Sequence, residues 1–232
     1  MRAGKKLAHD SHEQTQWRGR LGYMAAIVWE VGVTFDCVAL GAGLDCRLRI
    51  EGMSLESTKS VDETVASLAS IRTESGANLL GLVEESPVLL VFLRHFGCSF
   101  CRQAISDVAE LGPELAQRGV RPVFVHLGPP ELAKVYFEYY GLGDVERVCD
   151  PEAVIYQLPI FALGQKNPLL QALNPVVWAG WLKGAIFKHG IGKIQGNGRQ
   201  MPGIFFLKDG KIVRRFIYKT IADEPDYLKL VR

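Results

Sequence analysis

The feature that most constrains the fold is a cysteine pair placed where a buried strand gives way to a helix. The run Val88–Leu93 is continuously apolar and of strand length, which is typical of a central strand covered on both faces. It is followed by Arg94-His-Phe-Gly-Cys98-Ser-Phe-Cys101, in which two cysteines have the spacing C-x-x-C. The unpaired N–H groups and partial positive charge of a first helical turn stabilise a thiolate. We therefore expect a low pKa for the more exposed Cys98, with the more shielded Cys101 close enough to form a disulfide.

A zinc half-site and a pair of unreactive buried thiols are the alternatives to a redox pair. A structural zinc site needs four ligands, and the chain has no second C-x-x-C. His95 and His126 are far apart in the sequence and could converge only through the fold. The strand–turn–helix context disfavours inert thiols. We therefore expect redox-active cysteines, no metal site and no cofactor.

The length, net charge and cysteine count indicate the number of domains, the kinds of partner and the compartment to expect. The 232 residues suffice for one sizeable domain with an appendage, and the net charge of +2 is too balanced to indicate a nucleic acid or an anionic membrane as partner. The five cysteines are an odd and sparse set, unlike the disulfide framework of a small secreted domain. We expect a cytoplasmic protein in which one cysteine pair does redox work.

The first 52 residues lack the order of the rest. A signal peptide or anchor would need an uninterrupted apolar stretch, but Glu30 lies near the middle of the apolar residues 21–44. A packed extension or a pair of strands is a second interpretation. A third is a true start at Met53, which we favour, so that residues 1–52 form an extension, disordered or outside the mature protein, and residues 53–232 form the domain. Cys37 and Cys46 would then have no function.

The remaining chain alternates between helical and strand patterns. The expected helices cover residues 61–72, 99–118 with a break at Pro113, and 131–140, and the expected strands cover 88–93, 122–126 and 145–149. Prolines divide the apolar segment 152–188 into short helices, and Asp209-Gly210 joins the strands 203–208 and 211–218 by a type I′ turn. This order predicts an α/β fold, a mixed central sheet flanked by helices, with a helical insert before the C-terminal hairpin.

From about Val61 to Tyr227 the chain resembles the thioredoxin-like alkyl hydroperoxide reductase and thiol-specific antioxidant superfamily, especially its selenoprotein-L-like and peroxiredoxin-like members with C-x-x-C. The residues that carry the resemblance are Arg94–Arg102, Cys149-Asp150-Pro151, Trp178–Lys188 and Met201-Pro202-Gly203-Ile-Phe-Phe-Leu207. The resemblance implies a thioredoxin fold, an antioxidant role and reduction of a peroxide or disulfide, with thioredoxin-like proteins or glutathione as reductant. It also implies a cis Met201–Pro202 bond facing the cysteines, with the Met201 backbone free to pair with an incoming chain.

The order of attack stays open at this stage. Peroxiredoxins have a threonine three residues before the attacking cysteine, and that alignment would make Cys101 the attacking thiol. In the thioredoxin arrangement the first cysteine of the C-x-x-C pair attacks, so Cys98 would be the nucleophile and Cys101 the resolving thiol. We prefer this assignment. Arg94 and Gly97 are predicted to support the pair, together with Met201 and Pro202.

Four further residues are candidates for a role at or around the cysteine pair. His95 and Arg102 flank the cysteines, and a nearby cation would lower a thiolate pKa. We expect His126 to be structural and Cys149 to be an unreactive thiol. The alternative function is a non-catalytic binding module that uses its hydrophobic insert for a partner.

Overall fold

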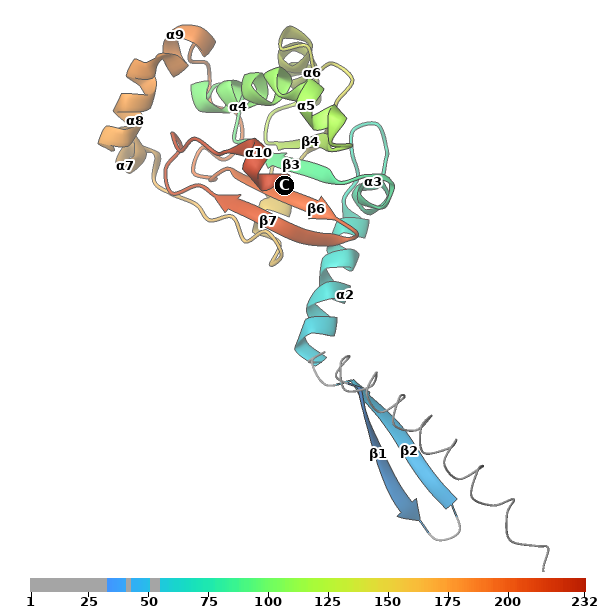
Figure 1. Ribbon diagram of the computed structural model, residues 1–232. Coiled ribbons are helices and arrows are strands. Elements are labelled where there is room, and N and C mark those ends of the chain that lie inside the picture. The colour runs from blue at the N-terminus through green and yellow to red at the C-terminus, as the bar shows by residue number, and fades with distance from the viewer. Residues whose placement is uncertain (1–32, 41–42, 51–54) are drawn as a thin grey trace, which may run out of the picture. The chain divides into compact units, whose positions relative to one another are not determined.

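The computed structural model describes residues 33–40, 43–50 and 55–232 (Figure 1). The chain divides into two compact units, Met1–Lys59 and Ser60–Arg232. The first contains an antiparallel hairpin of β1 (Val33–Leu40) and β2 (Gly43–Ile50), whose register places Cys37 opposite Cys46. Most of the predicted polar start and apolar stretch lies outside the described residues. The proposed domain boundary at residue 53 stays a prediction.

The second unit is built on a five-stranded mixed sheet of order β5-β4-β3-β6-β7. Parallel pairing joins β3 (Val88–Phe92), β4 (Arg121–His126) and β5 (Glu146–Cys149). On the other side of β3, β6 (Gly203–Lys208) and β7 (Lys211–Ile217) form an antiparallel hairpin. A parallel β-α-β unit extended by an antiparallel hairpin on its first strand is the thioredoxin-like arrangement, so the predicted fold class is confirmed.

Alternation along the central strand explains why both faces of the sheet are covered. Leu89 and Val91 belong to one apolar cluster, while Val88, Leu90 and Phe92 belong to another. The first cluster is closed by α4 (Ser99–Glu110), α5 (Gly112–Gln117), α6 (Pro130–Tyr139) and α10 (Tyr227–Leu230). The second is closed by the end of α2 (Leu55–Ser70), by α3 (Leu79–Glu85) and by residues 153–163. The all-buried β3 is therefore the central strand expected from its unbroken apolar run.

Two local predictions are confirmed in detail and one element was missed. The helix after the cysteines breaks at Leu111, between α4 and α5, because Pro113 cannot continue the hydrogen-bond ladder. Positive φ angles at Asp209 (52°) and Gly210 (71°) are those of the predicted type I′ turn. The seven-residue α3, capped by the Asn78 side chain, was not predicted, because so short a helix has too few turns for a helical period to show.

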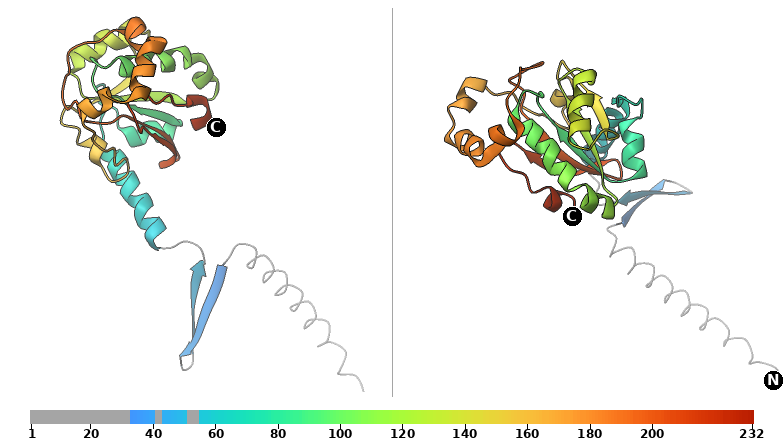
Figure 2. Two further views of the ribbon diagram at one scale, coloured as in Figure 1. Left: turned by 90° about the vertical axis from the view of Figure 1, so that its left-hand side faces the viewer. Right: turned by 90° about the horizontal axis from the view of Figure 1, so that it is seen from above.

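The insert between β5 and β6 is a chain of short helices. After η1 (Ile155–Gln157) come α7 (Pro168–Ala172), α8 (Pro175–Gly180), the π-helical η2 (Trp181–Ala185) and α9 (Ile186–His189). Prolines begin α7 and α8, as the sequence indicated, and an asparagine side chain caps each of these helices. Figures 1 and 2 show α7–α9 gathered at one side of the sheet, beside the N-terminal end of α4. Among the described residues, no helix combines the length and apolar character needed to cross a membrane.

Candidate active site

The cysteine pair lies where the buried β3 ends and α4 begins. Cys98 is the N-cap residue of α4 in extended conformation, and the Cys101 N–H donates to its carbonyl at 3.1 Å. Cys101 follows in the first turn, within the apolar stripe that holds α4 on the sheet. Both side chains are buried, Cys98 8% exposed and Cys101 4% exposed. The predicted order of exposure is confirmed, although the difference is small.

The surroundings of Cys98 favour its thiolate. A hydrogen bond from the Cys101 thiol makes the largest contribution, and it outweighs burial in lowering the pKa of Cys98 to about 6 from 9.0. The Arg94 guanidinium, with Nη1 3.9 Å from the Cys98 sulfur, adds a nearby positive charge. The N–H groups of Phe100 and Cys101 lower the pKa further, although neither forms a full cap hydrogen bond to this sulfur. Cys98 is therefore ionised near neutral pH.

Cys101 is held in the opposite state. Burial raises its pKa well above 9.0, and the neighbouring Cys98 sulfur raises it further. The backbone N–H of Arg94 donates to the Cys101 sulfur at 3.3 Å, which opposes the rise without reversing it. One sulfur is thus a thiolate and its neighbour a thiol that donates to it. Two groups with pKa values pushed apart in this way can take different parts in one reaction.

Arg94 is fixed by the segment that leads into β6. Its Nε donates to the Gln200 carbonyl at 2.9 Å and its Nη2 donates to the Gly198 carbonyl. Gln200 is fully buried, and its side-chain amide donates to the Leu163 carbonyl at 3.0 Å. The guanidinium therefore cannot turn away from the sulfur without breaking buried hydrogen bonds.

Met201–Pro202 differs from the sequence expectation. All described peptide bonds are trans, so the predicted cis bond is wrong. The Met201 N–H donates to the Gly164 carbonyl at 3.0 Å, and the Met201 carbonyl accepts from the Gln200 side chain at 3.3 Å. The Met201 backbone is thus already paired within the chain. Pro202 and both cysteines do line the same small cavity, of about 10 Å³.

Gly97 allows the insert to lie against the cysteine turn. The Gly192 N–H donates to the Gly97 carbonyl at 3.0 Å. A Cβ atom at Gly97 would lie 2.2 Å from the Lys193 carbonyl oxygen and 2.5 Å from that of Gly192. Any larger side chain would have to displace this backbone. The close approach of this backbone explains why position 97 is a glycine, whereas its role in supporting the cysteine pair stays a prediction.

A cavity of about 250 Å³, here called the thiol pocket, opens beside Cys98. Besides Arg94, His95 and Cys98, it is lined by Phe100, Pro168, Trp181, Ile191, Ile194 and Ile221, with the remaining contacts from neighbouring residues. Burial, with the charges of Arg94 and Arg102, lowers the pKa of His95 to about 4, so its imidazole is neutral. The His95 Nδ1 atom has no hydrogen-bond partner in the described residues. The pocket is therefore mainly apolar, with a thiolate and a neutral imidazole in its wall.

Arg102 does not act on the thiols directly, and the expectation that it flanks the thiolate as a cation is replaced by a structural role. Its Nη1 donates to the His189 carbonyl at 2.6 Å, its Nη2 donates to the Tyr136 hydroxyl at 2.6 Å, and its Nε donates to the Phe96 carbonyl. The guanidinium carbon lies 4.6 Å from the centre of the Tyr136 ring. Arg102 thus joins α4 to α6 and to the end of α9. Only the fold brings these segments together, so no sequence pattern indicated this role.

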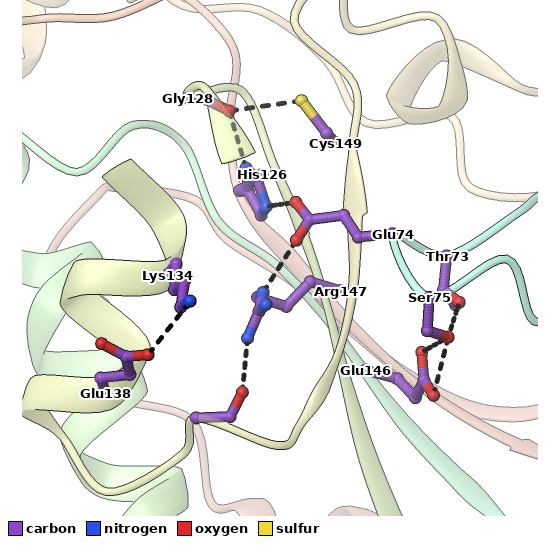
Figure 3. Close-up of polar contacts among 11 residues, drawn as sticks. Thr73, Glu74, Ser75, His126, Gly128, Lys134, Glu138, Glu146, Arg147 and Cys149 are labelled. Carbon is purple, nitrogen blue, oxygen red and sulfur yellow. Dashed lines mark hydrogen bonds and ion pairs between the residues drawn. The ribbon is translucent and has the colours of Figure 1, made fainter. Parts of the chain in front are cut away.

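A second polar cluster lies at the ends of β4 and β5 (Figure 3). The buried His126 hydrogen-bonds through Nδ1 with the Gly128 carbonyl at 3.0 Å and through Nε2 with Glu74 at 2.9 Å. Both ring nitrogens of His126 are therefore engaged with oxygen atoms of the chain. The other Glu74 oxygen accepts from Arg147 at 3.0 Å. Burial raises the pKa of Glu74, but the hydrogen bonds from His126 and Arg147 outweigh it and leave the pKa lowered.

This cluster also includes Cys149. Ligand atoms of Glu74, His126 and Cys149 lie within 4.8 Å of one another, a spacing that could admit a metal ion. Both ring nitrogens of His126 already pair with oxygen atoms, and Arg147 already pairs with Glu74. Burial and nearby carboxylates raise the pKa of Cys149, whose sulfur lies 3.3 Å from the Gly128 carbonyl. The geometry is that of a structural ion-pair network beside an unreactive thiol.

No family model matches the chain. Two curated proteins do match in sequence, both named prostamide/prostaglandin F synthase. The protein from Salmo salar is 29% identical over 162 residues, covering 67% of this chain and 78% of that protein. The protein from Danio rerio is 29% identical over 150 residues, covering 62% and 72%.

Solved structures with related folds are more distant in sequence. Peroxiredoxin Q from Xanthomonas campestris has a TM-score of 0.46 and 14% identity, covering 68% of this chain and 85% of that one. A secreted Mycobacterium tuberculosis disulfide oxidoreductase homologous to E. coli DsbE has a TM-score of 0.44 and 16% identity, covering 73% and 97%. The fold assignment therefore depends on the order and direction of the strands in this sheet. The chain is a thioredoxin-fold protein with a C-x-x-C pair, similar in sequence to curated proteins named prostamide/prostaglandin F synthase.

Proposed function

We propose that the chain is a thiol oxidoreductase in which Cys98 attacks and Cys101 resolves. The observation that carries the proposal is the opposed ionisation of the two sulfurs beside the thiol pocket. A thiolate is the nucleophile in thiol–disulfide and peroxide chemistry, and a neighbouring thiol captures the product.

The reaction balances with a peroxide as oxidant. The Cys98 thiolate attacks one peroxide oxygen, the O–O bond breaks, and the leaving oxygen takes a proton to become an alcohol or water. Cys98 is then a sulfenic acid, or a sulfenate ester if the peroxide was a dialkyl or cyclic one. Cys101 attacks that sulfur, a disulfide forms, and water or the alcohol leaves. An external dithiol or two glutathione molecules reduce the disulfide by thiol exchange.

Lining residues favour an apolar peroxide over hydrogen peroxide. Most of the pocket wall is apolar or aromatic, and a wall of this kind binds an apolar ligand by removing its surface from water. The name of the two relatives points to prostaglandin-type substrates, which are fatty-acid derivatives. We propose an organic peroxide with an apolar body as the preferred substrate, and a disulfide as the alternative.

Stopped-flow oxidation of the reduced full chain tests the proposal. Hydrogen peroxide, a fatty-acid hydroperoxide, a cyclic organic peroxide and a small disulfide are mixed in turn with the protein, and lost thiols are counted. We expect two thiols lost per oxidant and the highest second-order rate for an apolar peroxide. No loss of thiols with any of the four would reject the redox function and favour a non-catalytic binding module.

Single variants decide the order of attack. In Cys98→Ser the first step should disappear, whereas Cys101→Ser should still be oxidised once and then stop at the sulfenic acid, which a dimedone adduct detects. If only Cys101→Ser loses the first step, then Cys101 is the attacking thiol, as the peroxiredoxin alignment would have it.

A further inference from the structure

Exposed apolar side chains are concentrated in one stretch of the insert. Of the fourteen large hydrophobic side chains that are exposed in the described residues, nine lie between residues 169 and 194. We call this set the apolar patch; it consists of Leu169, Leu170, Leu173, Val176, Trp178, Leu182, Phe187, Ile191 and Ile194. Single exposed hydrophobic residues are normal, whereas a large exposed apolar patch is typical of a site that contacts a partner or a membrane.

The same stretch is locally basic, which the net charge of the whole chain conceals. Residues 153–200 contain no acidic side chain, but they contain five basic ones, Lys166, Lys183, Lys188, Lys193 and Arg199. Lys188 and Lys193 are exposed, and neither forms an ion pair with the residues that the structure describes, whereas Lys183 pairs with Glu224 at 3.4 Å. Burial raises the pKa of Asp107 to about 6, and the charge of Lys188 opposes that rise, so Lys188 has one carboxyl nearby. A partner for this surface should therefore combine an apolar region with negative charge.

These features are those of helices that lie in a membrane interface. Such helices present Trp, Phe and Leu to the acyl boundary and Lys to anionic headgroups, without crossing the bilayer. Trp178 is 55% exposed and Phe187 is 83% exposed, and both belong to the short helices α8 and α9. We propose that the apolar patch docks the protein peripherally on an anionic membrane surface, with Lys188 and Lys193 near the lipid phosphates. This departs from the sequence expectation of no membrane partner, which used the charge of the whole chain.

Docking of the patch would turn the mouth of the thiol pocket toward the lipid. Ile191 and Ile194 belong to the patch, at 64% and 58% exposed, and both also line the pocket beside Cys98. An apolar peroxide that partitions into the membrane would thus meet the pocket without crossing water. The docking itself does not depend on the redox function; only this delivery to Cys98 rests on it.

Vesicle co-sedimentation of the reduced full chain tests the docking. The probes are vesicles of phosphatidylcholine alone and of phosphatidylcholine with phosphatidylserine. We expect binding to the anionic vesicles to be at least tenfold tighter, and to weaken with added salt because exposed charges are screened. A blue shift of tryptophan emission should accompany binding and should be reduced in Trp178→Phe, which still binds.

Matched variants separate the two parts of the surface. Leu173→Asp/Phe187→Asp removes apolar contacts and Lys188→Glu/Lys193→Glu reverses charge; each should weaken binding about tenfold or more. Val135→Asp, at a side chain 60% exposed on α6 outside the patch, is the control and should bind as the parent does. Unchanged circular dichroism and an unchanged rate of Cys98 alkylation show that the variants are folded.

Three outcomes would overturn the proposal. These are no binding to either vesicle, equal binding to both vesicles, and loss of binding in Val135→Asp to the same extent as in the patch variants. A dimer that Leu173→Asp/Phe187→Asp disperses, with no vesicle binding, would assign the patch to a second copy of this chain instead. Cys98→Ser/Cys101→Ser should bind vesicles normally, so failure of the redox function is distinguishable from failure of the docking.

Discussion

The contribution of Cys101 to the ionisation of Cys98 can be measured by changing one atom. The thiol of Cys101 makes the largest contribution to lowering the Cys98 pKa to about 6. Cys101→Ala removes this donor, whereas Cys101→Ser replaces it with a hydroxyl that can donate in its place. The two variants should therefore differ sharply in the Cys98 pKa, although both lack the resolving thiol.

The size of the effect follows from the strength of the lost hydrogen bond. A hydrogen bond to a charged group contributes about 1.5–3 kcal/mol, which corresponds to about 1–2 pKa units. In Cys101→Ala the Cys98 pKa should rise to about 7–8, and the ionised fraction at pH 7 should fall from about 90% to between about 50% and about 10%. In Cys101→Ser the pKa should stay within about 0.5 unit of that of the parent.

Thiolate absorbance near 240 nm, followed against pH, gives the pKa directly. The background carries Cys37→Ser, Cys46→Ser and Cys149→Ser, so that Cys98 is the titrating thiol in both variants. Iodoacetamide alkylation is a second readout, in which the higher nucleophilicity of a more basic thiolate offsets part of the change. A Cys98 pKa that stays near 6 in Cys101→Ala, or that rises equally in Cys101→Ser, would refute the reasoning.

Three further predictions concern the surroundings of the pair. Arg94→Met removes the guanidinium 3.9 Å from Cys98, and titration should show a pKa raised by about 1 unit, whereas no change would contradict the electrostatic role. Gly97→Ala would place a methyl group against the backbone of the insert. We expect the free energy of unfolding in urea to fall by about 1–3 kcal/mol and proteolysis near residue 192 to become faster. An unchanged urea midpoint would show that the insert backbone moves aside at no cost in stability. The lowered pKa of Glu74 stabilises the fold above the unfolded value of 4.5, and this contribution disappears as the pH falls through the lower folded pKa. Glu74→Gln should therefore cost about 1 kcal/mol at pH 7 and progressively less in acid, and a cost that does not vary with pH would count against the role of the charged carboxylate as partner of His126 and Arg147.

Features set by local sequence could be predicted. The buried β3, the C-x-x-C at the start of α4, the break near Pro113 and the turn at Asp209-Gly210 all follow from a few neighbouring residues. Each depends on an apolar run, on the geometry of proline or on a positive φ angle, and the residues that cause it are close neighbours in the sequence.

Features set by contacts between distant segments could not be predicted. The segment 189–200 has no apolar period, yet it supplies the carbonyls that hold Arg94 and Arg102 and the backbone that lies against Gly97. The Met201 backbone pairs with Gly164 and Gln200, contacts that the resemblance did not include. The basic and apolar character of the insert was visible in the sequence, but its exposure depends on how α7–α9 pack.

The attachment of Arg102 and Gly97 to the insert limits how the chain can be shortened. The α4 helix that carries both sulfurs also holds the end of α9 through Arg102, while the turn before it is paired to Gly192. A trimmed thioredoxin core, with residues 160–198 replaced by a short loop, would expose the buried guanidinium of Arg102 and free the first turn of α4. Minimal versions of this protein must therefore keep the insert or redesign that turn along with it.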